Sequence, residues 1–311
     1  MATGRKVGSG GQRKRGLAGR GPTPKAEDRV YHKAYQARQG AGQGGKQAGR
    51  RGGRPSSHGH GAGADWVVGR NPVLEAMTAG LPIKAGYVAE GSERDDRLRD
   101  IFKYAAEHSI SLLQTTRAEL DRLTGGAVHQ GVALQLPSYD YAHPDDVMAD
   151  ALADETREAL VVALDGITDP HNLGAIIRSA AAFGVHGVVI PERRSASVTA
   201  VAWKASAGAL ARVPVARAGN LNRTIVDYAK AGFTVVGLAG EGETDIAGVP
   251  GVDGPLMLVV GSEGEGLARL TRERCDLLAR IPISSQVESL NASVAAGIAL
   301  YEVARCRGDL V

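Results

Sequence analysis

Cysteine is scarce in this sequence. Among 311 residues there are two cysteines, Cys275 and Cys306, and both lie in patterns that predict helices. Neither has histidine partners at the spacing of a zinc site, so the sequence argues against a structural zinc, and we expect no metal cofactor. A low cysteine content is typical of a reduced compartment, and we therefore expect a cytoplasmic protein.

Long apolar runs are also missing. A secretory leader needs an apolar core of about 7 to 15 residues, and a helix that spans a membrane needs about 20. The sequence has no stretch of either kind. We therefore expect neither a secretory leader nor a membrane-bound protein.

Acidic residues are nearly absent from residues 1–64. This segment has 14 Lys and Arg against Glu27 and Asp28, a net charge of +12, so the remaining residues carry −9 of the chain's net +3. It is rich in Gly, Arg and Lys and has few large apolar residues, so it cannot bury enough surface to offset the entropy lost on ordering. We expect a disordered basic tail. Such a tail either binds phosphate backbones or is a solubilising or expression-related leader, and the sequence leaves both open.

The rest of the chain divides into two folded parts and a connection. Residues 65–141 alternate short strands and helices, which predicts a small α/β domain with a turn at 69–72, a helix from Val73 and a last strand in HQGVALQLPSY. Residues 142–157 are polar and acidic and are expected to be a partly helical linker. Residues 158–311 form the second folded part.

This second part contains continuous apolar runs separated by helical patterns. The runs are ALVVALDGI, GVHGVVIP, ARVPVAR, FTVVGLAG, PLMLVVG and LLARIPI. Strands that are apolar at successive positions are typical of a sheet covered by helices on both faces, so we predict an α/β domain with a largely parallel sheet. Because ligands of such sheets bind beyond the carboxyl ends of the strands, the segments that follow strands are candidates for a site.

The segment DPHNLGAIIRSAAAFG, residues 169–184, follows the first of these runs and predicts a helix with one isolated charge. The stripe expected to pack on the sheet consists of Leu173, Ile176, Ile177, Ala180 and Gly184. Arg178 points away from this stripe, among small residues one helical turn away, and no Asp or Glu lies on the helix. Arg178 is either a solvated surface arginine or a group that faces a ligand or a second protein surface.

A glycine-rich turn, GSEGEG, occupies residues 261–266 after another apolar run. Its spacing is not that of a dinucleotide-binding loop, and Glu263 and Glu265 stand where a pyrophosphate needs bare amides. This argues against a Rossmann-type dehydrogenase. A ligand with a positive charge, such as a sulfonium with an amino-acid head group, suits the turn. The alternative is an ordinary tight turn with a solvated glutamate.

The segment after the last run contains SSQVESLNASVAAG. Ser289 or a near neighbour is expected to cap a helix, and the small residues that follow allow another element to come close. Asn291 is a poor helix former; it either bonds to the local backbone or holds a ligand or a neighbouring loop. If the three strand ends converge, they bring together Asn172, Arg178, Glu263, Ser289 and Asn291.

The three segments, in this order, resemble the signature motifs of the SpoU family of RNA ribose 2′-O-methyltransferases, in the SPOUT class. The matching stretches are DPHNLGAIIRSAAAFG, VVGSEGEGL and IPISSQVESLNASVAAG. In addition, VVGRNPVLEAM and HQGVALQ resemble the small N-terminal RNA-binding domain of one branch of the family. The resemblance covers residues 66–306 and leaves the basic tail outside.

This resemblance implies a C-terminal SPOUT domain with a trefoil knot, a homodimer with the active site at the interface, and S-adenosylmethionine as cofactor. It implies that backbone groups of Gly261, Ile281 and Leu290 hold the cofactor, with Leu238 and Gly240 lining the same pocket. The functional positions that it implies are Asn172, Arg178, Glu263, Ser289 and Asn291. The expected activity is methylation of a guanosine ribose in the P loop of 23S rRNA. The alternatives are tRNA or another rRNA nucleotide linked to antibiotic resistance, and a non-catalytic ribosome-assembly factor that binds RNA.

For such a reaction the protein mainly has to position the ribose 2′-hydroxyl against the methyl donor. The family's usual proposal makes the arginine at the position of Arg178 the base. An arginine with a pKa above about 12 is nearly always charged, so we prefer the hypothesis that Arg178 grips the phosphate of the target nucleotide and stabilises the developing alkoxide. The 2′-hydroxyl as acceptor implies RNA and not DNA.

Overall fold

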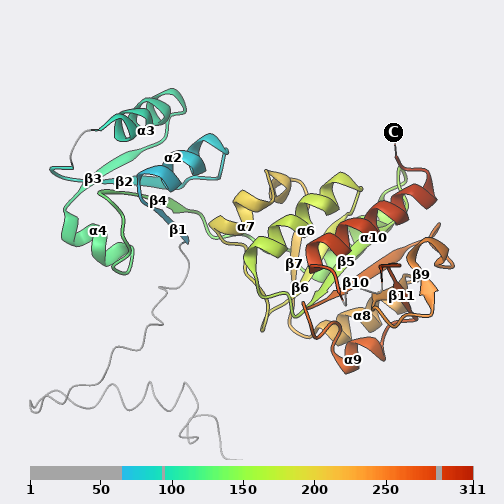
Figure 1. The fold of residues 1–311 in the computed structure, drawn as a ribbon. Coiled ribbons are helices and arrows are strands. Elements are labelled where there is room, and N and C mark those ends of the chain that lie inside the picture. The colour runs from blue at the N-terminus through green and yellow to red at the C-terminus, as the bar shows by residue number, and fades with distance from the viewer. Residues whose placement is uncertain (1–64, 93–94, 285–288, 311) are drawn as a thin grey trace, which may run out of the picture. The chain divides into compact units, whose positions relative to one another are not determined.

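The structure is a computed structural model that describes residues 65–92, 95–284 and 289–310 (Figure 1). The expected basic tail, residues 1–64, lies outside the described residues and stays a prediction. In the described ranges, no helix is both long and apolar enough to cross a membrane.

A four-stranded sheet in the order β1-β4-β2-β3 forms the centre of the N-terminal domain. The strands are β1 (Asp65–Val68), β2 (Ala85–Ala89), β3 (Leu112–Thr115) and β4 (Val132–Leu136). Three helices complete the domain: α2 (Arg70–Thr78), α3 (Asp96–Glu107) and α4 (Arg117–Leu123). Strand β4 pairs antiparallel with β1 and β2, and β2 pairs parallel with β3. Because side chains alternate along a strand, one face packs on α2 and α3 and the other on α4.

The predicted order of strands and helices in this domain is confirmed, with two shifted boundaries. Helix α2 begins at Arg70 and not at Val73, because Gly69 takes a φ of 93° and turns the chain directly into the helix. The last strand begins at Val132, because Gln130 and Gly131 have φ values of 51° and 84°, which interrupt the extended backbone.

Seven strands form the sheet of the second domain, in the order β7-β6-β5-β10-β8-β11-β9. They are β5 (Leu160–Asp165), β6 (Gly187–Pro191), β7 (Val215–Ala218), β8 (Thr234–Leu238), β9 (Thr244–Asp245), β10 (Leu256–Gly261) and β11 (Leu277–Arg280). All neighbouring pairs are parallel, which confirms the predicted sheet. Each of the six apolar runs contains one strand, whereas the short strand β9 has no apolar run to reveal it.

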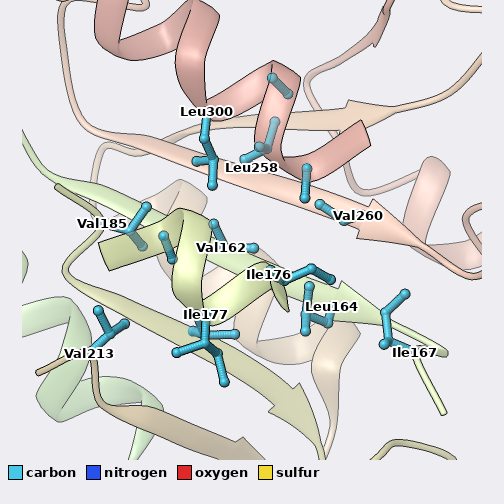
Figure 2. Packing of buried hydrophobic residues seen from close by; sticks show 14 of the residues in the cluster. Val162, Leu164, Ile167, Ile176, Ile177, Val185, Val213, Leu258, Val260 and Leu300 are labelled. Atoms are coloured by element: carbon cyan, nitrogen blue, oxygen red, sulfur yellow. The ribbon is translucent and has the colours of Figure 1, made fainter. Parts of the chain in front are cut away.

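Helices cover both faces of this sheet. The helices are α5 (Pro144–Ala153), α6 (Pro170–Ala182), α7 (Ala200–Ala205), α8 (Leu221–Lys230), α9 (Arg269–Arg272) and α10 (Ala292–Arg307), with the 3-10 turns η2 (Ala209–Ala211) and η3 (Ile246–Gly248). On one face, Ile176 of α6 and Leu300 of α10 belong to the same buried cluster as Leu258 of β10 (Figure 2). On the other face, α5 and α8 pack against the alternate residues of the same strands.

The expected linker, residues 142–157, contains helix α5. One side of this helix is buried, at Val147 and Ala151, in the cluster on one face of the sheet. A side chain on Gly187 of β6 would come within 2.5 Å of Val147, so the helix lies directly on that strand. The polar composition hides this packing because the outer side of α5 is acidic. The domain boundaries stay a prediction.

Helix α6 also packs closely on α7. A Cβ on Gly174 would lie 2.5 Å from the carbonyl oxygen of Ala202 and 2.6 Å from the Cβ of Ala205. The small residues around Arg178 were expected to leave room for a ligand or a second surface. At Gly174 this room is filled by α7 of the same chain.

We expect Gly174→Ala to destabilise the fold by about 1–3 kcal/mol, because the added methyl group displaces the backbone of α7. This loss outweighs the better helix propensity of alanine, which is worth about 1 kcal/mol. The matched control is Gly248→Ala, whose Cβ meets nothing within 4 Å; it is expected to stay within about 0.5 kcal/mol of the parent. Urea unfolding followed by circular dichroism measures both, and equal stability of the two variants contradicts this account of the packing.

Candidate functional site

A cavity of about 710 Å³ opens at the carboxyl ends of strands β8, β10 and β11. The residues that line it lie at the ends of these strands, in the turn after β10, in α9, and just before and within the first turn of α10. They include all five positions that the resemblance assigns to the cofactor: Leu238, Gly240, Gly261, Ile281 and Leu290. This is the edge of a parallel sheet at which ligands bind.

The turn after β10 forms one wall of the cavity and has a closed backbone geometry. A Cβ on Gly261 would collide with the backbone of Gly266, so the wall can form only with glycine at position 261. Ser262 and Gly266 exchange two backbone hydrogen bonds of 3.0 Å. Since each of these amides donates to the carbonyl oxygen of the other residue, they are not available to a phosphate, as the glycine spacing predicts.

The lining of the cavity is partly apolar and partly charged. The apolar side chains include those of Leu238, Ile281, Ile283 and Leu290, and the charged ones are Glu241, Glu265, Arg269 and Arg272. A purine ring suits the first group, and the ends of a charged amino acid suit the second. S-adenosylmethionine therefore fits this cavity in size and in chemistry.

The sequence analysis missed two basic residues of this wall. Arg272 forms an ion pair with Glu241, and Arg269 with Glu273 at 2.7 Å. Their position just after the glycine-rich turn is the signal that could have found them. Arg269, Arg272 and Glu241 line the cavity and contribute charges of both signs there.

Three of the predicted functional residues form one hydrogen-bonded cluster beside the cavity. The Nδ2 of Asn172 donates to Oε1 of Glu263 at 2.9 Å. The Nδ2 of Asn291 donates to the same Oε1 and to Oδ1 of Asn172, the latter at 3.1 Å. The residues come from α6, from the turn after β10 and from the start of α10. The fold thus brings together three segments that are far apart in the sequence.

Asn291 also begins helix α10. Its Oδ1 accepts hydrogen bonds from the backbone amides of Ser293, at 2.9 Å, and Val294, at 3.3 Å. The cap expected at Ser289 or a near neighbour is therefore Asn291, while Ser289 is exposed and lines the cavity. Both alternatives for Asn291 are realised, because its oxygen bonds to the local backbone and its nitrogen holds two neighbouring segments.

Arg178 lies outside this cluster, on the exposed side of α6. It is not among the residues that line the cavity. Within the part of the chain that the structure describes, its guanidinium has no hydrogen bond or ion pair. The fold thus leaves this charge free to meet another molecule.

Cys275, packed against strand β8, is poorly suited to act as a nucleophile. Burial raises the pKa of its thiol to about 12, and its Sγ donates to the carbonyl oxygen of Thr271 at 3.3 Å. The thiolate is the reactive form of cysteine, so a methyl relay through this residue is not supported. Among the described residues, His, Cys, Asp and Glu form no group of three or more that could hold a metal ion.

Comparison with known proteins identifies both parts of the chain. Residues 159–301 match the model of the SpoU rRNA methylase family. Residues 66–142 match the model described as RNA 2′-O ribose methyltransferase substrate binding. The two matches follow each other along the chain, as the two sheets do.

Whole proteins and solved structures agree with these matches. An uncharacterized tRNA/rRNA methyltransferase of Mycobacterium avium is 54% identical over 301 residues, which cover 97% of this chain and 93% of that protein. One of Mycobacterium tuberculosis is also 54% identical and is covered to 89%. The SpoU methyltransferase AviRb from Streptomyces viridochromogenes, solved in complex with AdoMet, matches with a TM-score of 0.57 and 25% identity, over 79% of this chain and 91% of that chain. The chain belongs to the SpoU family of RNA methyltransferases.

Proposed function

We propose that this protein transfers a methyl group from S-adenosylmethionine to the ribose 2′-hydroxyl of a guanosine in the P loop of 23S rRNA. The observation that carries the proposal is the cluster of Asn172, Glu263 and Asn291 at the edge of a cavity that fits the cofactor. Membership of the SpoU family supports RNA methyl transfer, and the match of residues 66–142 supports RNA as substrate. We place the reaction in the cytoplasm, in line with the low cysteine content.

The cofactor site of this proposal is the cavity at the carboxyl ends of β8, β10 and β11. Backbone groups of Gly261, Ile281 and Leu290 would hold the cofactor, and Leu238 and Gly240 would line the same pocket. The AviRb structure with AdoMet supports this choice of ligand. When bound, S-adenosylmethionine supplies a methyl group on a positively charged sulfur.

The polar residues have two roles in this proposal. Asn172, Glu263 and Asn291 position the turn after β10 and the start of α10, which are walls of the cavity. Arg178 binds the phosphate of the target nucleotide through its paired N–H groups and stabilises negative charge on the ribose oxygen. Because its guanidinium stays charged, it acts as an electrostatic group and not as the base.

A homodimer is part of the proposal, since Arg178 does not line the cavity of its own chain. Helix α10 exposes Val294, Ile298 and Tyr301 along one stripe. This stripe adjoins α6, because a Cβ on Gly297 would lie 3.3 Å from Oγ of Ser179, the neighbour of Arg178. In this proposal a second copy packs on these apolar residues, and Arg178 of each chain acts at the site of the other. The trefoil knot that the family resemblance implies belongs to the same proposal.

Methylation of tRNA or of another rRNA nucleotide is the second candidate function. The observation that favours it is the description of the mycobacterial relatives, which names tRNA and rRNA together. A non-catalytic role in ribosome assembly is less well supported, because the hydrogen-bonded polar cluster beside the cavity is intact.

Mapping of ribose methylation across all cellular RNA, with and without the gene, tests the target. We expect a single guanosine in the P loop of 23S rRNA to lose its methyl group in the deletion strain. The full chain supplied in trans should restore it. Loss of a methyl group at a tRNA position or at a different rRNA nucleotide would overturn the P-loop assignment and favour the second candidate.

For Arg178→Ala we expect kcat/KM for RNA methylation to fall by about 100-fold or more, since a charge that stabilises the reacting oxygen is removed. Arg178→Lys should recover part of this loss, because an ammonium keeps the charge without the paired N–H groups. Binding of S-adenosylmethionine, measured by calorimetry, should be unchanged. The control is Arg223→Ala on α8, on the other face of the sheet. If Arg178→Lys keeps RNA affinity but has no activity, phosphate binding alone does not explain the role of Arg178.

Variants of Asn291 separate the hydrogen bonds of its side-chain oxygen, which cap α10, from those of its side-chain nitrogen, which reach Asn172 and Glu263. Asn291→Asp keeps the capping oxygen but turns a carboxylate towards Glu263, so we expect cofactor affinity to fall about tenfold with a small loss of stability. Asn291→Ala removes the cap as well. We expect it to lower the free energy of unfolding by about 1 kcal/mol and also to weaken cofactor binding. Calorimetry with S-adenosylmethionine and thermal unfolding measure the two effects. Unchanged cofactor affinity in Asn291→Asp would mean that the cluster does not shape the cavity.

A further inference from the structure

One face of the N-terminal sheet is only partly covered by a helix. Leu120 of α4 packs on Ala89 and Ala133 and buries one part of this face. Trp66 and Tyr87 pack against this cluster but stay half-buried, and Leu113 is 47% exposed. Large apolar side chains that stay accessible together on a domain surface indicate a binding site.

These partly exposed residues are close together and lie on the same face of the sheet. The ring centroids of Trp66 and Tyr87 lie 5.3 Å apart, with an angle of 53° between the planes. The hydroxyl of Tyr87 donates to Oε1 of Gln135 at 3.3 Å. In the sheet, Trp66 pairs with Gln135 and Tyr87 with Leu113, so all four side chains lie on one face. We call Trp66, Tyr87, Leu113 and Gln135 the aromatic platform.

We propose that the aromatic platform binds an unpaired nucleobase of the RNA substrate, an inference that rests on the proposed RNA-modifying function. Aromatic side chains on an open sheet face stack on bases that are not in a duplex. The side-chain oxygen of Gln135 is held by Tyr87, while its NH2 group has no partner among the residues that the structure describes. This NH2 group can donate a hydrogen bond to the edge of a stacked base.

The charge of the adjoining chain favours a nucleic acid as the occupant. Residues 1–64 carry a net charge of +12 and lead directly into strand β1, one residue before Trp66. A polyanion attracted to this segment is thereby concentrated beside the strand that carries Trp66. A purely apolar protein surface would not match the hydroxyl and amide groups beside the rings.

The fluorescence of Trp66 tests this contact directly. The chain contains two tryptophans, so in the full chain with Trp203→Phe the emission comes from Trp66 alone. We expect an RNA hairpin with a single-stranded loop to quench this emission, and a blunt RNA duplex with the same number of phosphates to leave it unchanged. Equal quenching by the duplex, or no quenching by either RNA, would overturn the proposal. The second outcome would point to a protein as the occupant.

Affinities for the same hairpin give an independent measurement. Trp66→Ala and Tyr87→Ala should each raise its Kd about tenfold, as expected for the loss of one stacked base. Trp66→Phe keeps an aromatic face and should stay within about threefold of the parent. The matched control is Phe102→Ala, on α3 at the other face of the sheet, where the aromatic side chain is 42% exposed. Thermal unfolding checks that each variant is folded, and equal weakening by Phe102→Ala would contradict a specific platform.

The test of the aromatic platform and the test of the methylated nucleotide can fail independently of each other. If the methylation map leads to another RNA but Trp66 still responds to unpaired loops, the platform stands and the P-loop assignment fails. If the P-loop guanosine is methylated but Trp66 does not respond to either RNA, the platform alone fails. Raised salt adds a further check, because phosphate contacts weaken with salt more than stacking does.

Discussion

A single carboxylate oxygen, Oε1 of Glu263, joins three segments of the second domain, and two of them, the turn after β10 and the start of α10, line the cavity. It accepts hydrogen bonds from the side chains of Asn172 and Asn291. Hydrogen bonds to a charged acceptor are stronger than those between neutral groups, and here two of them meet at one atom. The starts of α6 and α10 are therefore joined to the turn after β10 through one atom.

Apolar packing of the helices on the sheet supports this arrangement. Ile176 of α6 and Leu300 of α10 lie in one buried cluster with strand β10, so both helices are anchored on the same sheet (Figure 2). Gly261 then lets the backbone after β10 fold back against Gly266. A rigid apolar base and a polar edge together give a preorganised pocket, which is what a transfer reaction between two bound molecules requires.

In the proposed function, substrate recognition is spread over parts of the chain that have different physical characters. Arg178 offers a charge without a partner among the described residues, the aromatic platform offers surfaces for stacking, and residues 1–64 offer a high positive charge. Charge supplies attraction to RNA of any sequence, whereas stacking selects bases that are not paired. This combination suits a target nucleotide in a folded RNA with an accessible loop.

The sequence by itself determined the parallel sheet and the segments that line the cavity, because buried strands need continuous apolar runs and ligands bind where such strands end. It also singled out Asn172, Glu263 and Asn291, although not their mutual contacts. Those contacts join residues 91 and 119 positions apart, and only the tertiary structure decided them. The same holds for the packing of α5 on the sheet and for the neighbours of Trp66. Strand order and register follow from pairing between distant segments, and local patterns carry no information about which segments pair.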